Sequence, residues 1–164
     1  MLNKIINKYY IFENLNKNNN NIHIDDEYNL KIIKNINQID LKILDKDDFK
    51  ILENGLLYNA EAICIFYNNK IAHVTWIAFS KTSQNFVDNI PTKIDWKNSI
   101  IWGRAFTSKH HRNKHLYSYA QQEMQKYLIE IGIQKQYFSI KAKNLPSLIA
   151  MQKFNPKVIK IFYR

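Results

Sequence analysis

Hydrophobic positions in the second half of the chain recur with the periods of regular secondary structure. Between residues 116 and 131 the apolar residues fall close to one face of a helix with a period of about 3.6 residues, and Gly132 is its natural end. Residues 136–142 alternate between apolar and polar side chains, which predicts a strand. The other segments predicted in this half are strands at 99–107 and 158–163 and a short helix at 144–154.

Two runs rich in β-forming residues, 60–67 and 71–79, flank the residues Asn68 and Asn69. Asparagine tolerates the left-handed backbone that tight hairpin turns require, so the pattern predicts an antiparallel hairpin. The polar segment 81–98 is expected to be a long connection, and such connections often border a substrate site.

The first 55 residues predict their elements less sharply. Asp45 is a good N-cap for a short helix over residues 45–55, with acidic residues in its first turn, and Gly55 is expected to end that helix. The remaining interpretations are a strand or a short helix within 1–16, a surface loop at 18–21 and a strand at 28–36.

Read in order, the clearer elements are a hairpin, a strand, a helix, a strand, a helix and a strand. This order predicts a layered α/β fold in which a right-handed crossover joins strands 99–107 and 136–142. A length of 164 residues suits one domain with one core, over residues 1–164.

Charge is distributed unevenly. Residues 1–100 contain 12 Lys+Arg and 12 Asp+Glu, whereas residues 101–164 contain 12 Lys+Arg and 2 Asp+Glu, so the second segment carries the whole net charge of +10. Such a segment suits a polyanionic cofactor, an acidic protein partner or nucleic acid. A solvated basic face without a ligand is the alternative.

Cys64 is the only cysteine, so no disulfide can form within the chain, and a cytoplasmic location is expected. No apolar run approaches the roughly 20 residues that span a bilayer. Polar residues interrupt the apolar positions at the N-terminus, so a signal peptide is not expected there.

The segment His110–Tyr117 is a basic, hydrogen-bonding loop between the predicted strand at 99–107 and the predicted helix at 116–131. At the start of a helix the free backbone N–H groups point outward and the helix dipole favours negative charge. The arrangement therefore predicts a site for a phosphorylated cofactor.

These motifs resemble the GNAT superfamily of N-acetyltransferases. The cofactor signature of that family is a strand, then a pattern of the kind Arg/Gln-x-x-Gly-x-Gly/Ala, then a helix, and residues 107–120 occupy these places. A later strand in the family ends in an Asn with a small residue three positions on, matched by Asn144 and Ser147. The resemblance covers about residues 60–158, and the hairpin that ends at Trp76 is similar to a subgroup met among bacterial surface-polysaccharide biosynthesis proteins.

The resemblance implies a mixed, mostly antiparallel central sheet with flanking helices and a splayed parallel strand pair. Residues 99–156 would form the cofactor-binding core and residues 1–55 a divergent N-terminal part. Acetyl-CoA, or another acyl-CoA, would lie in the opening between the two splayed strands as the co-substrate.

Several positions depart from the family pattern. Asn113, His115 and Tyr117 stand where the family usually has glycine, which lets a pyrophosphate approach the backbone. Met151 stands where many relatives have a tyrosine that acts as general acid. Asn155, followed by Pro156, replaces a Gly-Phe pair, and asparagine can adopt the same left-handed geometry as glycine.

By the same resemblance, backbone groups of three strand residues would pair with the pantetheine arm, and amides of the following loop would hold the pyrophosphate. Asn144 would bond the arm, Ser147 would reach the departing thiolate, and an N–H near residue 106 would polarise the thioester carbonyl. The expected cofactor-binding residues are Ala105, Phe106, Thr107, Arg112, Asn113, Lys114, His115, Leu116, Tyr117, Asn144 and Ser147.

Amine attack needs a neutral nucleophile, and His73 is the first candidate for its base because imidazole titrates near neutrality. The catalytic set is therefore His73, Ser147 and Tyr117. Tyr117 or Tyr119 could supply a proton where Met151 cannot. Asp95 and Glu61 are the weaker candidates for the base.

A metal site is not expected. The histidines at 110, 111 and 115 have no cysteine nearby and no second ligand pair at conventional zinc spacing. The aromatic residues are expected to form the core, and Cys64 is expected to be inert packing. The residues assigned to the core are Trp76, Trp102, Phe106, Phe138 and Phe154.

The leading hypothesis is an enzyme that transfers an acetyl or longer acyl group from CoA to a primary amine, such as an amino sugar. Acyl carrier protein is an alternative acyl donor. The competing classes are a basic protein that binds nucleic acid or acetylates tRNA, and a degenerate family member that binds CoA without catalysis. A monomer and a homodimer both remain open.

Overall fold

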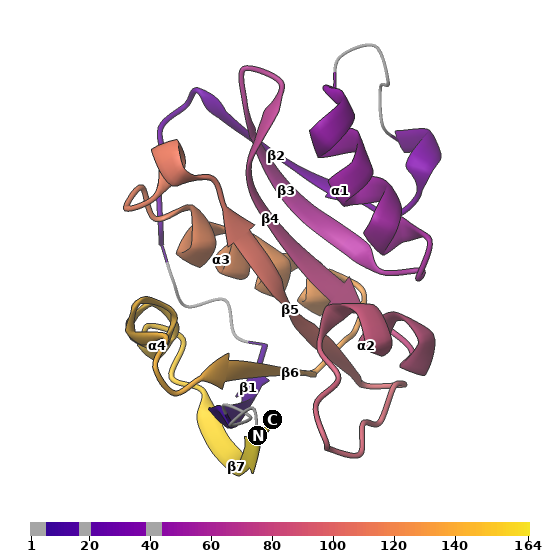
Figure 1. Ribbon diagram of the computed structural model, residues 1–164, viewed down its shortest axis with the longest axis vertical. Coiled ribbons are helices and arrows are strands. Elements are labelled where there is room, and N and C mark those ends of the chain that lie inside the picture. Colours follow the sequence, from indigo (N-terminus) through magenta and orange to yellow (C-terminus); the bar gives the residue numbers. More distant parts are fainter. Residues whose placement is uncertain (1–5, 17–20, 39–43) are drawn as a thin grey trace, which may run out of the picture.

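In the computed structural model of this chain, which describes residues 6–16, 21–38 and 44–164, seven strands form one sheet in the order β2-β3-β4-β5-β6-β1-β7 (Figure 1). The strands are β1 (Lys8–Leu15), β2 (Tyr28–Ile33), β3 (Glu61–Tyr67), β4 (Lys70–Ala78), β5 (Ser99–Thr107), β6 (Lys135–Lys141) and β7 (Lys157–Tyr163). Neighbouring strands are antiparallel except for β5 and β6, which run parallel. This confirms the predicted fold class.

Four α-helices and two short 3-10 turns accompany the sheet in the described part of the chain. The helices are α1 (Lys46–Leu56), α2 (Lys81–Val87), α3 (Leu116–Glu130) and α4 (Leu145–Gln152). The 3-10 turns are η1 (Ile36–Gln38) and η2 (Lys109–His111). None of these helices is long and apolar enough to cross a membrane.

The helices lie on both faces of the sheet and bury one core on each (Figure 1). On one face, Leu116 and Met124 of α3 pack with Ile63 of β3, and Met151 of α4 joins the same cluster. On the other face, Leu52 of α1 packs with residues of β3, β4 and α2. Alternate residues of β3 therefore serve opposite cores, as the pleat requires.

The predicted hairpin is present as β3 and β4. Asn68 and Asn69 at its turn have positive φ angles of 47° and 63°, the conformation predicted from their side chains. The antiparallel pairing then continues from β4 to β5, with a register irregularity between Val74 and Trp76.

Helix α1 begins as predicted, because the Asp45 side chain accepts from the amides of Asp47 and Asp48. Its end differs from the prediction. Gly55 lies inside the helix, where a Cβ atom would come within 2.2 Å of the Trp76 ring. This glycine is required for close packing rather than as the helix terminator.

The connection predicted over 81–98 was wrong in part, because its first seven residues form α2. Ser80 and Ser83 cap this helix reciprocally, since each side chain bonds the backbone of the other residue. Because this helix is short and polar, its hydrophobic periodicity is weak. The capping pair of Ser80 and Ser83 is the clearest indication of the helix in the sequence.

The N-terminal strand has a position that the sequence did not indicate. β1 lies between β6 and β7 and pairs with both, so residues from the start of the chain complete the second half of the sheet. Backbone bonds between Asn7 and Arg164 extend this pairing, so β1 and β7 lie side by side at one edge of the sheet (Figure 1). The predicted loop at 18–21 falls mainly outside the described residues.

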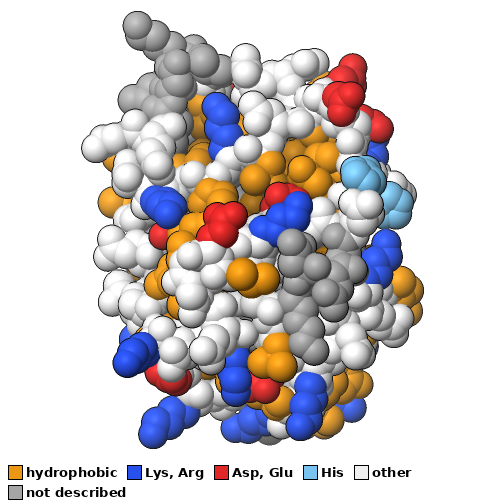
Figure 2. All heavy atoms as spheres, turned by 180° about the vertical axis from the view of Figure 1, so that it is seen from behind, with side chains coloured by type: hydrophobic (Ala, Val, Ile, Leu, Met, Phe, Trp, Pro, Cys, Tyr) orange, Lys and Arg blue, Asp and Glu red, His pale blue; other side chains and the backbone are white. Residues whose placement is uncertain are grey.

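Basic side chains do not gather into one continuous patch on the face that α3 covers. Figure 2 shows Lys and Arg side chains spread over this face among apolar, acidic and other polar residues.

Candidate active site

The parallel strands β5 and β6 separate soon after they begin. They pair only from Ser99 to Ile101, and β5 then bulges, so that Arg104 and Ala105 lie opposite the single residue Thr75 of β4. Arg104 has a φ angle of 49°, which is uncommon for a residue with a side chain. The separation leaves the edge of β5 beyond Ile101 without a strand partner on the β6 side.

One cavity, of about 720 Å³, lies between the end of β5, the start of α3 and the start of α4. Ten of the eleven predicted cofactor-binding residues line it. The lining residues are Ala105, Phe106, Thr107, His111, Arg112, Asn113, His115, Leu116, Tyr117, Ser118, Asn144, Pro146, Ser147, Ile149, Ala150 and Lys153. The exception is Lys114, whose ammonium group lies over the Tyr28 ring, 5.6 Å from its centroid.

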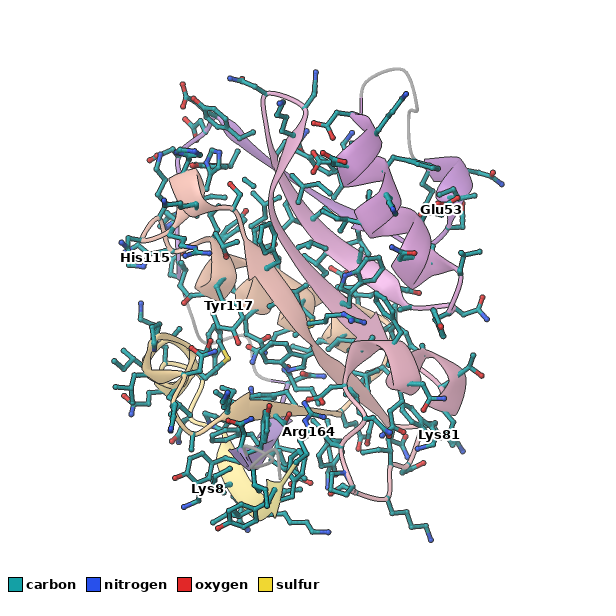
Figure 3. All side chains as sticks on the ribbon, viewed as in Figure 1. Lys8, Glu53, Lys81, His115, Tyr117 and Arg164 are labelled. Atoms are coloured by element: carbon teal, nitrogen blue, oxygen red, sulfur yellow. The ribbon has the colours of Figure 1, made fainter. Side chains whose placement is uncertain are left out.

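The loop before α3 adopts glycine-like geometry without glycine. Asn113 and His115 have φ angles of 63° and 59°. The amides of Leu116, Tyr117 and Ser118 have no hydrogen-bond partner among the described residues, as expected for the first turn of a helix. His115 is exposed and points away from the molecule (Figure 3). Three free donors therefore remain at the positively polarised end of α3.

The same loop is tied to the sheet on its outer side. His111 Nδ1 lies 2.8 Å from the Tyr28 hydroxyl, and the His111 ring packs on Tyr67 with centroids 4.9 Å apart. Arg112 Nε donates to the Thr107 carbonyl at 3.3 Å. Within the described residues no group of three or more His, Cys, Asp or Glu side chains is arranged to hold a metal ion.

A second cavity, of about 490 Å³, lies on the other side of the strand separation. The residues that line it are Tyr9, Asn85, Phe86, Val87, Asp88, Asn89, Trp102, Gly103, Arg104, Ala105, Tyr117, Phe138, Ser139, Ile140, Lys141, Asn144, Ser147 and Arg164. They come from both ends of the chain and from the segment after α2, which the sequence had indicated as a border of the substrate site.

The Asp88 carboxylate lies at the wall of this second cavity. The Ser139 hydroxyl and amide both donate to it, and Arg164 Nη1 lies 3.3 Å from its Oδ1. Burial raises the pKa of Asp88, although its bonds to Ser139 and Arg164 partly oppose this effect. A Cβ at Gly103 would lie 3.3 Å from the Asp88 Cβ, so this glycine makes room for the acid.

Four residues line both cavities: Ala105, Tyr117, Asn144 and Ser147. Tyr117 is in the first turn of α3, and its side chain extends toward α4 (Figure 3). Burial raises the pKa of its hydroxyl well above the usual value, and the Ser147 side chain partly opposes the shift. The Tyr117 hydroxyl is therefore protonated at neutral pH and can donate a proton where the cavities meet.

Asn144 and Ser147 occupy this junction through the start of α4. Asn144 Oδ1 accepts from the Ser147 amide at 3.4 Å and so caps the helix. The Asn144 amide nitrogen has no hydrogen-bond partner among the described residues, and Asn144 lines both cavities. These two residues therefore have a structural role in addition to any contact with a cofactor.

The geometry speaks against His73 as the catalytic base. Its ring is fully buried, Nδ1 lies 2.8 Å from the Thr107 hydroxyl, and Nε2 lies 2.8 Å from the Thr75 hydroxyl. Burial lowers its pKa to about 3, and His73 lines neither of the two cavities. His73 holds β4 against β5 and remains neutral.

The other candidate acids and bases lie away from the two cavities. Glu61 accepts a hydrogen bond from the Tyr127 hydroxyl at 2.6 Å, and Asp95 bonds Asn98 in an exposed turn. Tyr119 lines neither cavity. Met151 is the buried residue of α4 and lines a separate apolar cavity.

The core assignments held for four of the five aromatic residues, and Phe106 is the exception. Trp76, Trp102, Phe138 and Phe154 are buried, whereas Phe106 is 48% exposed beside the first cavity. Cys64 is fully buried, and burial raises the pKa of its thiol, as expected for inert packing.

Sequence reasoning missed the charged residues of the second cavity, which are Asp88, Arg104, Lys141 and Arg164. Asp88 and Arg164 are 76 positions apart, and Arg104 owes its direction to the bulge in β5. The only signal in the sequence was the polar connection beyond residue 80.

No protein-family model matches the chain, and no curated protein matches it significantly. Its fold is nevertheless similar to solved structures of GNAT proteins. A tandem GNAT protein from the clavulanic acid biosynthesis pathway aligns with 98% of this chain and 53% of its own at a TM-score of 0.67 and 10% identity. An acetyltransferase of the GNAT family from Colwellia psychrerythraea aligns with 98% of this chain and 56% of its own at a TM-score of 0.63 and 9% identity.

A third structure is a GCN5-related glucosamine N-acetyltransferase region in a fungal multi-domain β-N-acetylglucosaminidase. It aligns with 96% of this chain and 20% of its own at a TM-score of 0.61 and 9% identity. This chain thus spans about half of the first two structures and a fifth of the third. At such identities the similarity shows the fold, which is the GNAT fold.

Proposed function

We propose that this protein is an N-acyltransferase that moves an acetyl or longer acyl group from acyl-CoA to a primary amine. The observation that carries the proposal is the junction of two cavities at the β5–β6 separation, with Tyr117, Asn144 and Ser147 common to both. A cofactor bound in the first cavity and an amine bound in the second would meet at this junction.

The first cavity fits a CoA molecule in its donor set. The free amides of Leu116, Tyr117 and Ser118 would hold the diphosphate, and Arg112 would add positive charge. The open edge of β5 from Ala105 to Thr107 would pair with the pantetheine arm as an added strand does. Bound acyl-CoA would supply the activated thioester.

Proton transfer at the junction falls to the Tyr117 hydroxyl, with Ser147 beside it. This hydroxyl is protonated at neutral pH and would donate to the departing thiolate, and the proton that the attacking nitrogen releases would restore it. The cations of the second cavity, Arg104, Lys141 and Arg164, disfavour an ammonium ion and so favour the neutral amine that attacks. This field reduces the need for a dedicated base.

An amino sugar is our proposed acceptor class, since one structural neighbour is described as a glucosamine N-acetyltransferase region. Acyl carrier protein is a second proposed donor, because the basic residues beyond position 100 suit its acidic surface. We further propose a cytoplasmic protein, monomeric or dimeric through the edge strand β7.

Binding to nucleic acid is the competing function, and it rests on the net charge of +10. It predicts an affinity that falls steeply with salt and no response to CoA. A degenerate member would bind CoA without transferring the acyl group.

Thermal unfolding with acetyl-CoA, with CoA and without ligand tests the proposal. A ligand at about 100 times its dissociation constant stabilises by about 2.7 kcal/mol, so both ligands should raise the unfolding temperature. Release of the CoA thiol in the presence of an amine then separates an enzyme from a degenerate binder. No shift at millimolar CoA would remove the proposal.

Arg112→Glu should weaken CoA binding by roughly tenfold or more without unfolding the protein, because it reverses a charge at the phosphate site. Lys109→Glu is the matched control, since Lys109 is exposed nearby and does not line the cavity. Equal affinities of the two variants would show that the phosphate site lies elsewhere.

A further inference from the structure

The second cavity carries more positive charge than an acceptor amine alone would favour. Its charged lining residues are Asp88, Arg104, Lys141 and Arg164, which give it three cations and one carboxylate. An amine without an anionic group gains little electrostatic energy from these cations, whereas an anion gains much. If the proposed function is correct, the charges that line this cavity therefore indicate the chemical class of the acceptor.

The one carboxylate is already engaged within the protein. The Asp88 side chain is 7% exposed, accepts two hydrogen bonds from Ser139 and contacts Arg164. It offsets part of the Arg164 charge and fixes the position of that side chain. Arg104 and Lys141 have no carboxylate partner among the described residues.

Arg104 is held in place with most of its donors free. Its Nη1 donates to the Phe86 carbonyl at 2.9 Å, and its guanidinium lies 4.4 Å from the Phe86 ring centroid. The Phe86 ring is itself packed against Tyr58 and Trp76. At the β5 bulge Arg104 has a left-handed backbone instead of the extended backbone of a strand. Such strain is concentrated at functional sites.

Arg164 is held in a similar way from the opposite end of the chain. Its guanidinium lies 4.5 Å from the Tyr9 ring centroid and 5.4 Å from that of Phe162. Its one ion pair in the described structure is with Asp88. Two guanidinium groups stacked on aromatic walls are thus pre-organised, so that little side-chain entropy is lost when they bind a ligand.

Trp102 adds a second, independent sign of a polar ligand. It lines the same cavity, is 2% exposed, and its indole Nε1 has no hydrogen-bond partner among the described residues. Buried donors are nearly always paired, so the unpaired indole N–H in the wall of this cavity is a donor that a polar ligand there could satisfy.

We infer that the acceptor is an amine that also carries an anionic group, a carboxylate or a phosphate, which Arg104 and Arg164 bind in the second cavity. A planar guanidinium matches the oxygen pairs of either anion. A carboxylate would come from an amino acid and a phosphate from a phosphorylated amino sugar. Binding of the anion by these two guanidinium groups would hold the amine next to Tyr117 at the junction, while Lys141 remains as a cation beside it.

The experiment compares amines that differ only in the anion. The pairs are alanine with alaninamide, for the carboxylate, and glucosamine 6-phosphate with glucosamine, for the phosphate. Binding to the complex of the protein with CoA is measured by calorimetry, and transfer from acetyl-CoA is measured by thiol release. One anionic member should bind and react at least about tenfold better than its neutral partner, and the preferred pair identifies the anion.

Arg104→Gln and Arg164→Gln should each remove most of this preference by raising KM for the anionic amine, with KM for acetyl-CoA unchanged. Lys143→Gln is the matched control, since it removes the same charge from an exposed residue outside both cavities. Circular dichroism and the acetyl-CoA response confirm that each variant is folded.

Equal binding of charged and neutral members, or binding of neither, would overturn the inference while leaving acyl transfer to other amines intact. Failure of acetyl-CoA to bind would instead overturn the proposed function. Amine binding is therefore measured a second time on the protein without CoA, so that failure of acetyl-CoA to bind does not hide the outcome for the anion.

Discussion

The two cavities that meet at the β5–β6 separation are built in different ways. The first is lined by two short stretches of chain, residues 105–118 and 144–153, and its expected ligands are main-chain amides. The second is lined by residues drawn from six segments between Tyr9 and Arg164, and its charged groups belong to side chains. A site made of backbone tolerates changes of side chain, whereas a site made of side chains is as specific as the residues that form it.

The first cavity illustrates this tolerance. Asn113 and His115 replace the customary glycines, yet both adopt the left-handed backbone, and the amides that follow stay free. The second cavity has no such freedom, because Arg104, Asp88 and Arg164 act through their charged groups. We therefore expect substitutions in the two cavities to separate cofactor binding from acceptor selection.

The largest effect is expected at the junction. Tyr117→Phe keeps the ring packing against Trp102 but removes the hydroxyl, so turnover should fall by about a hundredfold while CoA affinity changes by less than about twofold. Steady-state kinetics and calorimetry measure the two quantities. Tyr119→Phe is the control, because Tyr119 is on the same helix but lines neither cavity. Normal turnover of Tyr117→Phe would mean that the proton comes from another group.

A smaller effect is expected at His73, outside both cavities. Because its pKa falls from about 6.5 to about 3 on folding, the unfolded chain binds a proton that the native protein does not. Burial of the neutral His73 therefore makes its full contribution to the free energy of unfolding above about pH 6.5. As the pH falls from there toward about 3, the free energy of unfolding decreases by up to about 1.4 kcal/mol per pH unit.

His73→Gln removes this titration and leaves an amide to bond the hydroxyls of Thr75 and Thr107. The free energy of unfolding is measured with denaturant between roughly pH 7 and pH 4, where the histidine of the unfolded chain titrates. It should depend less on pH in the variant than in the original protein. Parallel curves would contradict the buried, neutral histidine. A folded variant that had lost its turnover would return His73 to the role of base.

The smallest effect is expected at His115. His115→Gly relieves a left-handed residue but frees the unfolded chain, so the net stabilisation should be about 1 kcal/mol or less. CoA affinity should stay the same, because the ligand would be the backbone. Gly132→Ala is the reciprocal control, since Gly132 has a φ angle of 79° in open space and should lose stability. Loss of CoA binding in His115→Gly would show that the imidazole is the ligand.

The sequence predicted the elements whose signals are local. Alternation, helical period and the Asn68-Asn69 turn located β3, β4, β5, α3, β6 and α4 to within a few residues, and Asp45 marked the start of α1. The loop before α3 was also predictable, because a strand, a basic loop and a helix follow one another directly in the chain.

The remainder depended on tertiary structure. Gly55 was read as a terminator because nothing local shows the Trp76 ring against it. The same holds for β1, whose place between β6 and β7 is set by partners more than a hundred residues away. His73 was read as a base because imidazole titrates near neutrality, and nothing local shows that the folded sheet buries its ring between the hydroxyls of Thr75 and Thr107.

Backbone NMR of the labelled protein titrated with CoA tests the central claim most directly. The amides of Leu116, Tyr117 and Ser118 should show the largest shift changes, and pantetheine, which lacks the diphosphate, should move them far less than it moves Ala105 to Thr107. Saturable CoA binding that leaves the three amides unmoved, or no binding at millimolar CoA, would contradict the account.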